Sequence, residues 1–399
     1  MRNDIDGTTK CKTHQVIRRN RHMEKVIVLG AAGTIGKVIV KDLAESGVDV
    51  IAADLDISKL EELRAWVGKP IAIASVNIKD HDATTELLQQ GKVCINAVNY
   101  IFNLDIMKAA ASAGVSVLDL GGLYTITKEQ LKLDEMMKQA QALSIVGMGS
   151  DPGVSNVFSR YGVEQLDEAE EIQIRFGSTT SGVTFPFAAD TILDEATKNA
   201  YAVKNGELVE VEPLGDEEFT VFHREIGIQQ TFSIIHSELA TLPTSYPQVK
   251  QITYKDTWDP ATIEKIRLFS SMGFMNTESG TEGPSPRRQL VSLLQQSLKE
   301  EPQWGTDELM VEVIGWKNGN RTTVKMELLT NYHRDWNVSA TQYATAIPAS
   351  IVAQMLLRGE IQATGVKPAE LCVDPDLFIS YLTKKQVRLL ITTSETREH

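Results

Sequence analysis

The first pattern in the chain that could do chemistry is a set of glycines spaced three residues apart. Gly30, Gly33 and Gly36 follow the apolar run at 26–29 and open a segment with apolar residues at helical spacing. Glycines let the backbone approach a diphosphate closely, and the free N–H groups and dipole of a helix N-terminus attract its charge. Asp54 ends the next apolar strand, where a carboxylate can accept the ribose hydroxyls. The pattern predicts a dinucleotide site, and the alternative is a tight turn that needed glycine.

The same carboxylate indicates the type of dinucleotide. Asp54 would repel a 2′-phosphate and its surroundings, "DLDISK", contain no arginine, so NAD is favoured. NADP is the alternative, because Lys59 is near. The candidate cofactor-binding residues are Gly30, Ala32, Gly33, Thr34, Ile35, Gly36, Asp54, Asn77, Ala97, Val98 and Asn99.

Polar side chains follow three later strands of the same region. Asn99 and Tyr100 come after the fourth apolar strand, Asp119 ends the fifth, and Ser150 and Asp151 follow the sixth. Because ligands of open α/β sheets bind beyond the carboxyl ends of the strands, we expect these groups to converge. Carboxylates and a tyrosine suit a substrate with an ammonium group, and we predict Asp119, Asp151 and Tyr100 as catalytic residues. For each one alone, a helix cap or a turn is the alternative.

Alternating strands and helices would position these groups. Between residues 24 and 150, six short apolar strands alternate with segments of helical periodicity. This pattern predicts an α/β fold with a parallel, doubly wound sheet. From about residue 157 the strands become longer, "KNGN" predicts a hairpin, and residues 277–288 are a polar loop rich in Gly and Pro. Helical periodicity returns at 341–360.

Length, charge and cysteine content limit the functional classes. A chain of 399 residues exceeds the usual size of a single core, so two domains are expected. The net charge of −13 argues against nucleic-acid binding, which needs a basic surface. Three widely spaced cysteines favour a reducing cytoplasm over a disulfide framework or a zinc site, and no metal is expected. No apolar run reaches the roughly 20 residues of a membrane helix.

Residues 1–22 are polar and basic and lack the apolar segment of a secretory signal. We expect a disordered lead-in, with Met23 as the natural first residue. A transit peptide is the alternative, which Asp4 and Asp6 weaken.

Several stretches of the chain resemble the saccharopine dehydrogenase family. The segment "GMGSDPGVSNV" at 147–157 is the most specific of them, and the glycine triplet is the least specific. The family includes saccharopine reductases, bacterial lysine 6-dehydrogenases and carboxynorspermidine dehydrogenases. The other similar stretches lie at 95–122, 190–214 and 339–378, so the likeness runs from about residue 24 to about residue 390.

The resemblance implies a domain plan. A Rossmann NAD(P)-binding domain at 23–150 is followed by an inserted α+β substrate and dimerisation domain at 151–337. Helices at 338–399 then return to pack on the Rossmann domain. The family also implies a homodimer.

The resemblance further implies an NAD(P)-dependent dehydrogenase acting on CH–NH or CH–NH2 groups of a lysine- or saccharopine-like amino acid. A carboxynorspermidine-type reductase of polyamine metabolism and a non-catalytic dinucleotide-sensing protein are the alternatives. Hydride transfer from a carbon that bears an amine requires a general base with a tuned pKa near that amine, and Asp119 or Asp151 could serve.

The resemblance also places the substrate. Its amino-acid end is expected beside Tyr100, Asp119 and the loop of Gly149, Ser150 and Asp151. A substrate carboxylate is expected at basic residues of the second domain, for which Arg224 and Lys255 are the candidates. The histidines at 223, 236 and 333 are expected to be structural or exposed, because no motif surrounds them.

Overall fold

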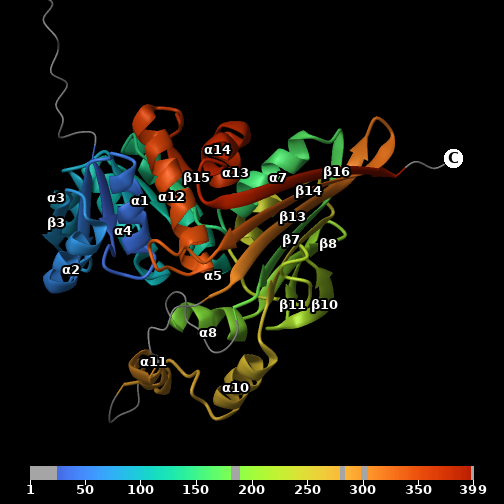
Figure 1. Cartoon of the computed structure of the whole chain (residues 1–399), viewed down its shortest axis with the longest axis horizontal. Helices are drawn as coiled ribbons and strands as arrows, with labels where there is room; N and C mark the ends of the chain where they lie inside the picture. The colour runs from blue at the N-terminus through green and yellow to red at the C-terminus, as the bar shows by residue number, and fades with distance from the viewer. Residues whose placement is uncertain (1–24, 181–188, 279–283, 298–303, 397–399) are drawn as a thin grey trace, which may run out of the picture.

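Two β-sheets organise the chain (Figure 1). The structure, a computed structural model, describes residues 25–180, 189–278, 284–297 and 304–396. The predicted lead-in at 1–22 and the proposed start at Met23 lie outside the described residues. One sheet has seven strands and the other has nine. No helix within the described ranges is long and apolar enough to cross a membrane.

The first sheet is parallel and carries the dinucleotide pattern. Its strand order is β15-β6-β5-β4-β1-β2-β3, which confirms the doubly wound arrangement predicted from the sequence. The strands are β1 (Val26–Leu29), β2 (Val50–Asp54), β3 (Ala72–Ser75), β4 (Val93–Asn96), β5 (Ser116–Asp119), β6 (Leu143–Val146) and β15 (Gly365–Pro368). The helices are α1 (Gly36–Glu45), α2 (Ile57–Val67), α3 (His81–Leu88), α4 (Asn103–Ala113), α5 (Leu123–Leu131) and α6 (Asp134–Gln139), with a 3-10 turn, η2 (Tyr100–Phe102).

Continuous apolar runs form the middle of this sheet. Every residue of β1 is fully buried, because β2 and β4 flank it and helices cover both of its faces. Because the strands are parallel, their carboxyl ends lie at one edge of the sheet. At this edge Asp54 ends β2, and the loops that carry Gly30 and Tyr100 begin.

The second sheet is mixed and lies beside the first (Figure 1). Its path is β10-β11-β12-β7-β13-β14-β16, with β8 on β12 and β9 on β8. The predicted "KNGN" hairpin is confirmed, since β13 and β14 pair along their whole length around a turn with positive φ at Asn318 and Gly319. The strands are β7 (Glu168–Ser178), β8 (Ala200–Lys204), β9 (Glu207–Val211), β10 (Gly215–Val221), β11 (Ile228–Ser233), β12 (Gln251–Thr257), β13 (Thr306–Lys317), β14 (Asn320–Asn331) and β16 (Val387–Thr396).

Helices of this second region pack around its sheet and between the two sheets. Apolar residues of β1, β13 and α12 belong to one continuous core, so the two sheets share their packing. Helix α12 is buried around most of its surface, as expected for a helix between two layers. The helices are α7 (Val154–Glu164), α8 (Ala189–Thr197), α9 (Glu238–Ser245), α10 (Pro260–Ser271), α11 (Pro286–Ser297), α12 (Ala340–Arg358), α13 (Ala369–Cys372) and α14 (Pro375–Leu382).

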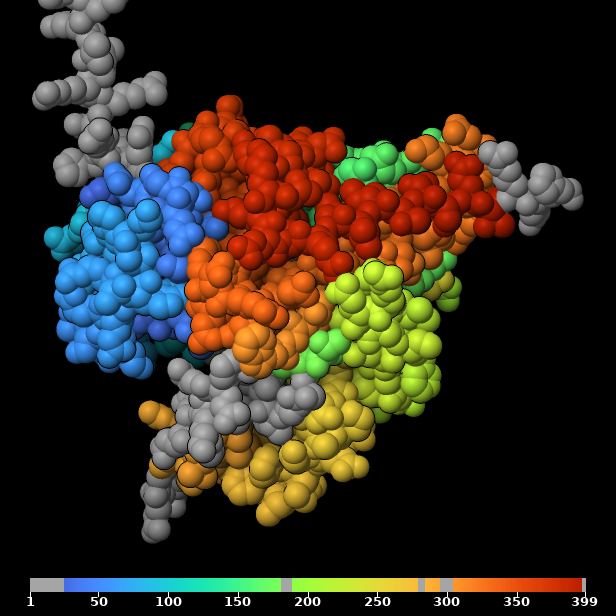
Figure 2. Space-filling view, in the orientation of Figure 1, coloured from blue at the N-terminus to red at the C-terminus, as the bar shows by residue number. Residues whose placement is uncertain are grey.

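The C-terminal region differs from the helices expected at 338–399. Helix α12 does return to α1, but two strands accompany it. The short strand β15 extends the first sheet, while β16 pairs with β14 at the edge of the second sheet. The β-branched run "ITTSET" within β16 explains why this segment is extended. Figure 2 shows β16, in red, lying along the surface of the molecule.

A buried carboxylate on α1 anchors this returning region. Asp42 accepts hydrogen bonds from Ser350 Oγ of α12 at 2.6 Å and from Lys385 Nζ at 2.6 Å. The Asp42 side chain is 5% exposed and that of Lys385 20%. The interaction therefore ties α1, α12 and the segment that leads into β16 together.

We expect Asp42→Ala to lower the free energy of unfolding by about 2 kcal/mol, because it leaves a partly buried ammonium and a buried hydroxyl without their acceptor. Urea denaturation of the purified chain measures the change. Glu45→Ala, which removes an exposed carboxylate of the same helix, is the control and should change stability by less than about 0.5 kcal/mol. Equal stability of the Asp42 variant and the wild type would contradict this assignment.

Candidate functional site

A cavity of about 230 Å³ opens at the carboxyl ends of β1, β2 and β4. Four of the predicted cofactor-binding residues line it, namely Gly30, Asp54, Asn77 and Val98, together with Lys79. The cavity thus lies where the sequence places the ribose of a dinucleotide.

The glycine loop has the close packing that a diphosphate cradle requires. Gly30 has φ +71°, and a Cβ on Gly36 would lie 2.1 Å from the Gly30 carbonyl oxygen. No side chain caps α1, and its first turn contains no acidic residue, so its N-terminal charge is open to an anion. Asp54 accepts the N–H groups of Ala32 (3.1 Å) and Leu55 (2.7 Å), which holds the loop against β2. These residues fit a bound NAD(P).

The remaining predicted cofactor residues have different surroundings. Thr34 is exposed on the loop, whereas Ile35 packs into the core with 7% exposure. The Ala97 carbonyl lies directly behind Gly30, where it would meet any Cβ. Asn99 caps η2 by accepting the Ile101 N–H at 3.1 Å. Ile35 and Asn99 therefore shape the loops, and a contact between their side chains and the cofactor stays a prediction.

Asp119 is buried and accepts hydrogen bonds from three protein groups. Its Oδ1 accepts the N–H groups of Gly121 (2.8 Å) and Gly147 (3.0 Å), and its Oδ2 accepts Gln130 Nε2 at 2.6 Å. The side chain is buried, and burial raises the pKa of this carboxyl. Because protein donors occupy both oxygens, Asp119 joins the loops after β5 and β6. The substrate contact and the catalytic role expected of Asp119 stay predictions.

Tyr100 is also tied to the protein. Its hydroxyl donates to the Asp194 carboxylate on α8, which also accepts Arg287 Nη2 at 2.8 Å and Lys198 Nζ at 3.0 Å. Burial, followed by the contact with Asp194, raises the pKa of Tyr100. Tyr100 thus stays protonated and connects the nucleotide domain to α8.

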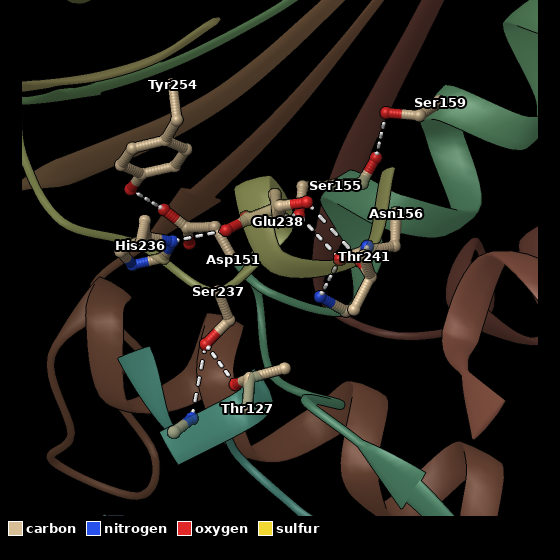
Figure 3. A network of polar contacts seen from close by, with 12 residues as sticks. Thr127, Asp151, Ser155, Asn156, Ser159, His236, Ser237, Glu238, Thr241 and Tyr254 are labelled. Atoms are coloured by element: carbon tan, nitrogen blue, oxygen red, sulfur yellow. Dashed lines mark hydrogen bonds and ion pairs between the residues drawn. The ribbon is translucent and has the colours of Figure 1, made fainter. Parts of the chain in front are cut away.

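Asp151 belongs to a cluster of ionisable groups that includes a histidine (Figure 3). The Tyr254 hydroxyl donates to Asp151 Oδ2, and the Tyr254 ring stacks on the His236 ring with centroids 3.9 Å apart and an interplanar angle of 2°. His236 Nδ1 lies 2.5 Å from Glu238 Oε2, and Glu238 Oε1 accepts the Ser155 hydroxyl at 2.7 Å. We call Asp151, Tyr254, His236 and Glu238 the Asp151–His236 centre.

Several elements bring this centre together. Asp151 lies on the loop between β6 and α7, His236 precedes α9, Glu238 begins α9, and Tyr254 lies on β12. Ser237 fixes the start of α9 to the nucleotide domain, since its Oγ accepts the Gly122 N–H at 3.2 Å. The centre therefore lies where the two sheets meet.

The loop of Gly149, Ser150 and Asp151 folds upon itself. The Gly149 N–H donates to the Pro152 carbonyl at 2.7 Å, and the Ser150 carbonyl accepts the Ser155 N–H at 3.0 Å. These backbone contacts of Gly149 and Ser150 shape the loop that carries Asp151 just before α7.

The two basic residues expected at a substrate carboxylate are not brought to the centre. Successive side chains of a strand point to opposite faces, so Lys255 faces away from its neighbour Tyr254. Its Nζ donates to Glu218 Oε2 at 2.7 Å and lies 3.9 Å from Asp216. Arg224 is exposed in the turn between β10 and β11.

Electrostatics gives the centre both a proton donor and a proton acceptor. Burial raises the pKa of Asp151 to about 6. Burial opposes the charge of His236, but Glu238, Asp151 and Glu195 together outweigh it and raise the pKa of His236 to about 9. Near pH 7 the centre thus combines a carboxylate with an imidazolium. No group within the described ranges hydrogen-bonds the second ring nitrogen, Nε2.

Sequence reasoning missed most of this centre. His236 was expected to be structural or exposed, like His333, which does stack with Trp336. One feature of the sequence could have indicated His236. It follows an apolar strand directly, and Glu238, two residues later, places an acid near the imidazole. In the described part of the chain, no three His, Cys, Asp or Glu side chains are arranged to hold a metal ion.

Comparisons with known proteins agree with this architecture. Residues 149–387 match the family model for the saccharopine dehydrogenase C-terminal domain, and residues 26–145 match that for the saccharopine dehydrogenase NADP binding domain. The chain is 24% identical over 383 residues to carboxyaminopropylagmatine dehydrogenase of Synechocystis, covering 90% of this chain and 95% of the relative. It is 23% identical over 390 residues to carboxynorspermidine synthase of Vibrio cholerae, covering 89% and 93%. The structure of saccharopine dehydrogenase (L-Glu forming) from Saccharomyces cerevisiae superposes with a TM-score of 0.73 at 14% identity, covering 93% of this chain and all of that one.

The Asp54 carboxylate in the cavity leads to a prediction about dinucleotide preference. We expect Asp54→Asn to raise the affinity for NADPH relative to NADH by about tenfold, on the order of 1.4 kcal/mol, because it removes repulsion of the 2′-phosphate. Fluorescence titration with each reduced dinucleotide measures the ratio. Glu62→Gln makes the same charge change on the exposed surface of α2 and should leave the ratio as it is. An unchanged ratio in the Asp54 variant would refute the assignment.

Proposed function

The chain belongs to the saccharopine dehydrogenase family, and on that basis we propose that it couples a cationic amine to an aldehyde by reducing the imine that they form. It is an NAD(P)-dependent oxidoreductase that acts at a carbon–nitrogen bond, as the sequence indicated. Of the alternatives named from the sequence, the polyamine-type reductase is favoured by two relatives whose names contain an agmatine and a norspermidine. A lysine- or saccharopine-like substrate stays an untested prediction.

The observation that carries this proposal is the Asp151–His236 centre. An amine can attack an aldehyde after its ammonium group has lost a proton, and the resulting carbinolamine loses water when its hydroxyl is protonated. With a pKa of about 6, Asp151 is ionised near pH 7 and can take the ammonium proton. With a pKa of about 9, His236 is protonated and can give a proton from Nε2 to the leaving hydroxyl.

The surrounding residues orient these two groups. Tyr254 holds the Asp151 carboxylate through its hydroxyl and supports the His236 ring by stacking. Glu238 binds Nδ1 and so leaves Nε2 directed away from the carboxylate. The glycine loop and Asp54 would hold NAD(P)H, which would supply the hydride that reduces the imine. Holding the donor and acceptor carbons in reach of each other would account for much of the rate.

We further propose that the protein works as a homodimer in the cytoplasm. Large apolar residues are exposed on the β10–β11 hairpin, where Phe219 is 75%, Val221 65% and Ile228 69% exposed. Exposed apolar groups that gather on one hairpin favour a protein contact. Light scattering on the purified protein should give about twice the chain mass of 44.1 kDa, and a monomer mass would refute the dimer. Cys94 and Cys372 are unpaired, as expected in a reducing compartment.

The two ionisable groups predict a pH profile for the coupling direction. The value of kcat/KM should fall below about pH 6, because Asp151 must be ionised, and above about pH 9, because His236 must be protonated. His236→Gln should lose the alkaline limb and reduce kcat by roughly 100-fold or more. Absorbance of NAD(P)H measures the rate.

His81→Gln is the matched control, because His81 is exposed on α3 and far along the sheet from this centre. It should keep the wild-type profile. If the His236 variant retained the alkaline limb, another group would be the proton donor.

A further inference from the structure

Two further carboxylates interact electrostatically with the Asp151–His236 centre, and no hydrogen bond joins them to it within the described residues. Glu195 of α8 is 6% exposed, and no donor from the described residues hydrogen-bonds its carboxylate. Asp256 lies two residues after Tyr254 on β12, hence on the same face of that strand. Its Oδ1 is buried without a hydrogen-bond partner among the described groups.

Both carboxylates interact electrostatically with the centre. Burial raises the pKa of Glu195 to about 8, with His236 lowering it and Asp151 raising it further. Burial and the charges of Asp151 and Glu195 raise the pKa of Asp256 well above its usual value. Asp151, Glu195, Glu238 and Asp256 thus all interact with the one imidazole of His236, and near pH 7 Glu195 is mostly protonated in the absence of a further cation.

The acidic residues of helix α8 differ in whether a cation hydrogen-bonds them. Asp190 and Asp194, one turn apart, both accept hydrogen bonds from Arg287, which is itself buried. Glu195 is the next residue after Asp194 and points about 100° further around the helix. The described residues supply a hydrogen-bonding cation to Asp190 and Asp194 and none to Glu195, which feels the charge of His236 without a hydrogen bond to it.

An ionised carboxylate buried without enough donors costs several kcal/mol, so such a group is either protonated or paired with a cation. Lys255 could have served from β12, but it faces the opposite side of the strand and binds Glu218. A ligand that brings N–H donors would let both groups ionise. An ammonium group has three N–H donors and a guanidinium has five.

We propose that Glu195 and Asp256 form a second-cation subsite, which binds the distal ammonium or guanidinium group of the amine substrate while its reacting nitrogen lies beside Asp151 and His236. The subsite rests on the proposed function, because it assumes that an amine enters this centre. It narrows the substrate to amines with a second positive charge and excludes monoamines as good substrates.

Steady-state kinetics with matched amines tests the subsite. Aspartate semialdehyde serves as the aldehyde, because it carries the carboxyaminopropyl unit in the relative's name. The amines are butane-diamine, agmatine and butylamine. The wild type should prefer one or both of the first two over butylamine by about 100-fold in kcat/KM, and the better of the two identifies ammonium or guanidinium as the distal group.

Glu195→Gln should lower kcat/KM for the preferred amine by about 100-fold and for butylamine by less than about fivefold. Asp256→Asn is a second variant with the same expected pattern, in case one of the two does not fold. Glu207→Gln, an exposed carboxylate on β9, is the matched control and should keep the wild-type preference. Equal loss for all amines in both carboxylate variants would overturn the subsite.

Calorimetry separates failure of the subsite from failure of the proposed function. At pH 7 in the presence of NADPH, binding of the preferred amine should release protons, because a bound cation ionises Glu195, and the release should disappear in Glu195→Gln. Turnover of butylamine as fast as of the diamine refutes the subsite and leaves the function. Binding that depends on Glu195 without turnover of any amine refutes the function and leaves the subsite. Absence of amine binding refutes the subsite.

Discussion

The ion pair between His236 and Glu238 is the interaction on which the rest of the site depends. His236 is buried among carboxylates, and an imidazolium there compensates charges that would otherwise repel one another in a medium of low dielectric constant. The ring of His236 supports Tyr254, and Tyr254 holds Asp151. One cation therefore determines the position and the protonation of the groups around it.

The architecture places this cation between two different surfaces. The parallel sheet supplies the glycine loop and the cavity beside Asp54, while the mixed sheet supplies Tyr254 and Asp256. The loop after β6 and the start of α9 connect the two, through Asp151 and through Ser237. Because the apolar core and helix α12 continue from one sheet to the other, these surfaces are held at a fixed separation. Hydride transfer requires that kind of fixed geometry.

The fold of the first half could be predicted because buried parallel strands appear as apolar runs between helices. The strand β15 could not, since its four residues include a proline and pair with β6 more than 200 residues earlier in the chain. The sequence could indicate Asp151, because this residue follows a strand of the first sheet and ligands of open α/β sheets bind beyond the carboxyl ends of the strands. The structural role of Asp119 could not be predicted, because donors from the loops after β5 and β6 and from helix α5 determine it. Tyr254 and Lys255 are neighbours on β12 and both are buried. The strand therefore lacks the alternation of buried and exposed residues that would indicate which of its faces borders the site.

The protonation state of His236 tests the account most directly. The chain has seven histidines, and the difference between ¹⁵N spectra of the histidine-labelled wild type and of the His236→Gln variant assigns the His236 signals. At pH 8 the His236 ring should give the ¹⁵N shifts of an imidazolium, with titration centred near pH 9. Shifts of a neutral ring at pH 7 would contradict it, since no cation would then balance the carboxylates of the centre.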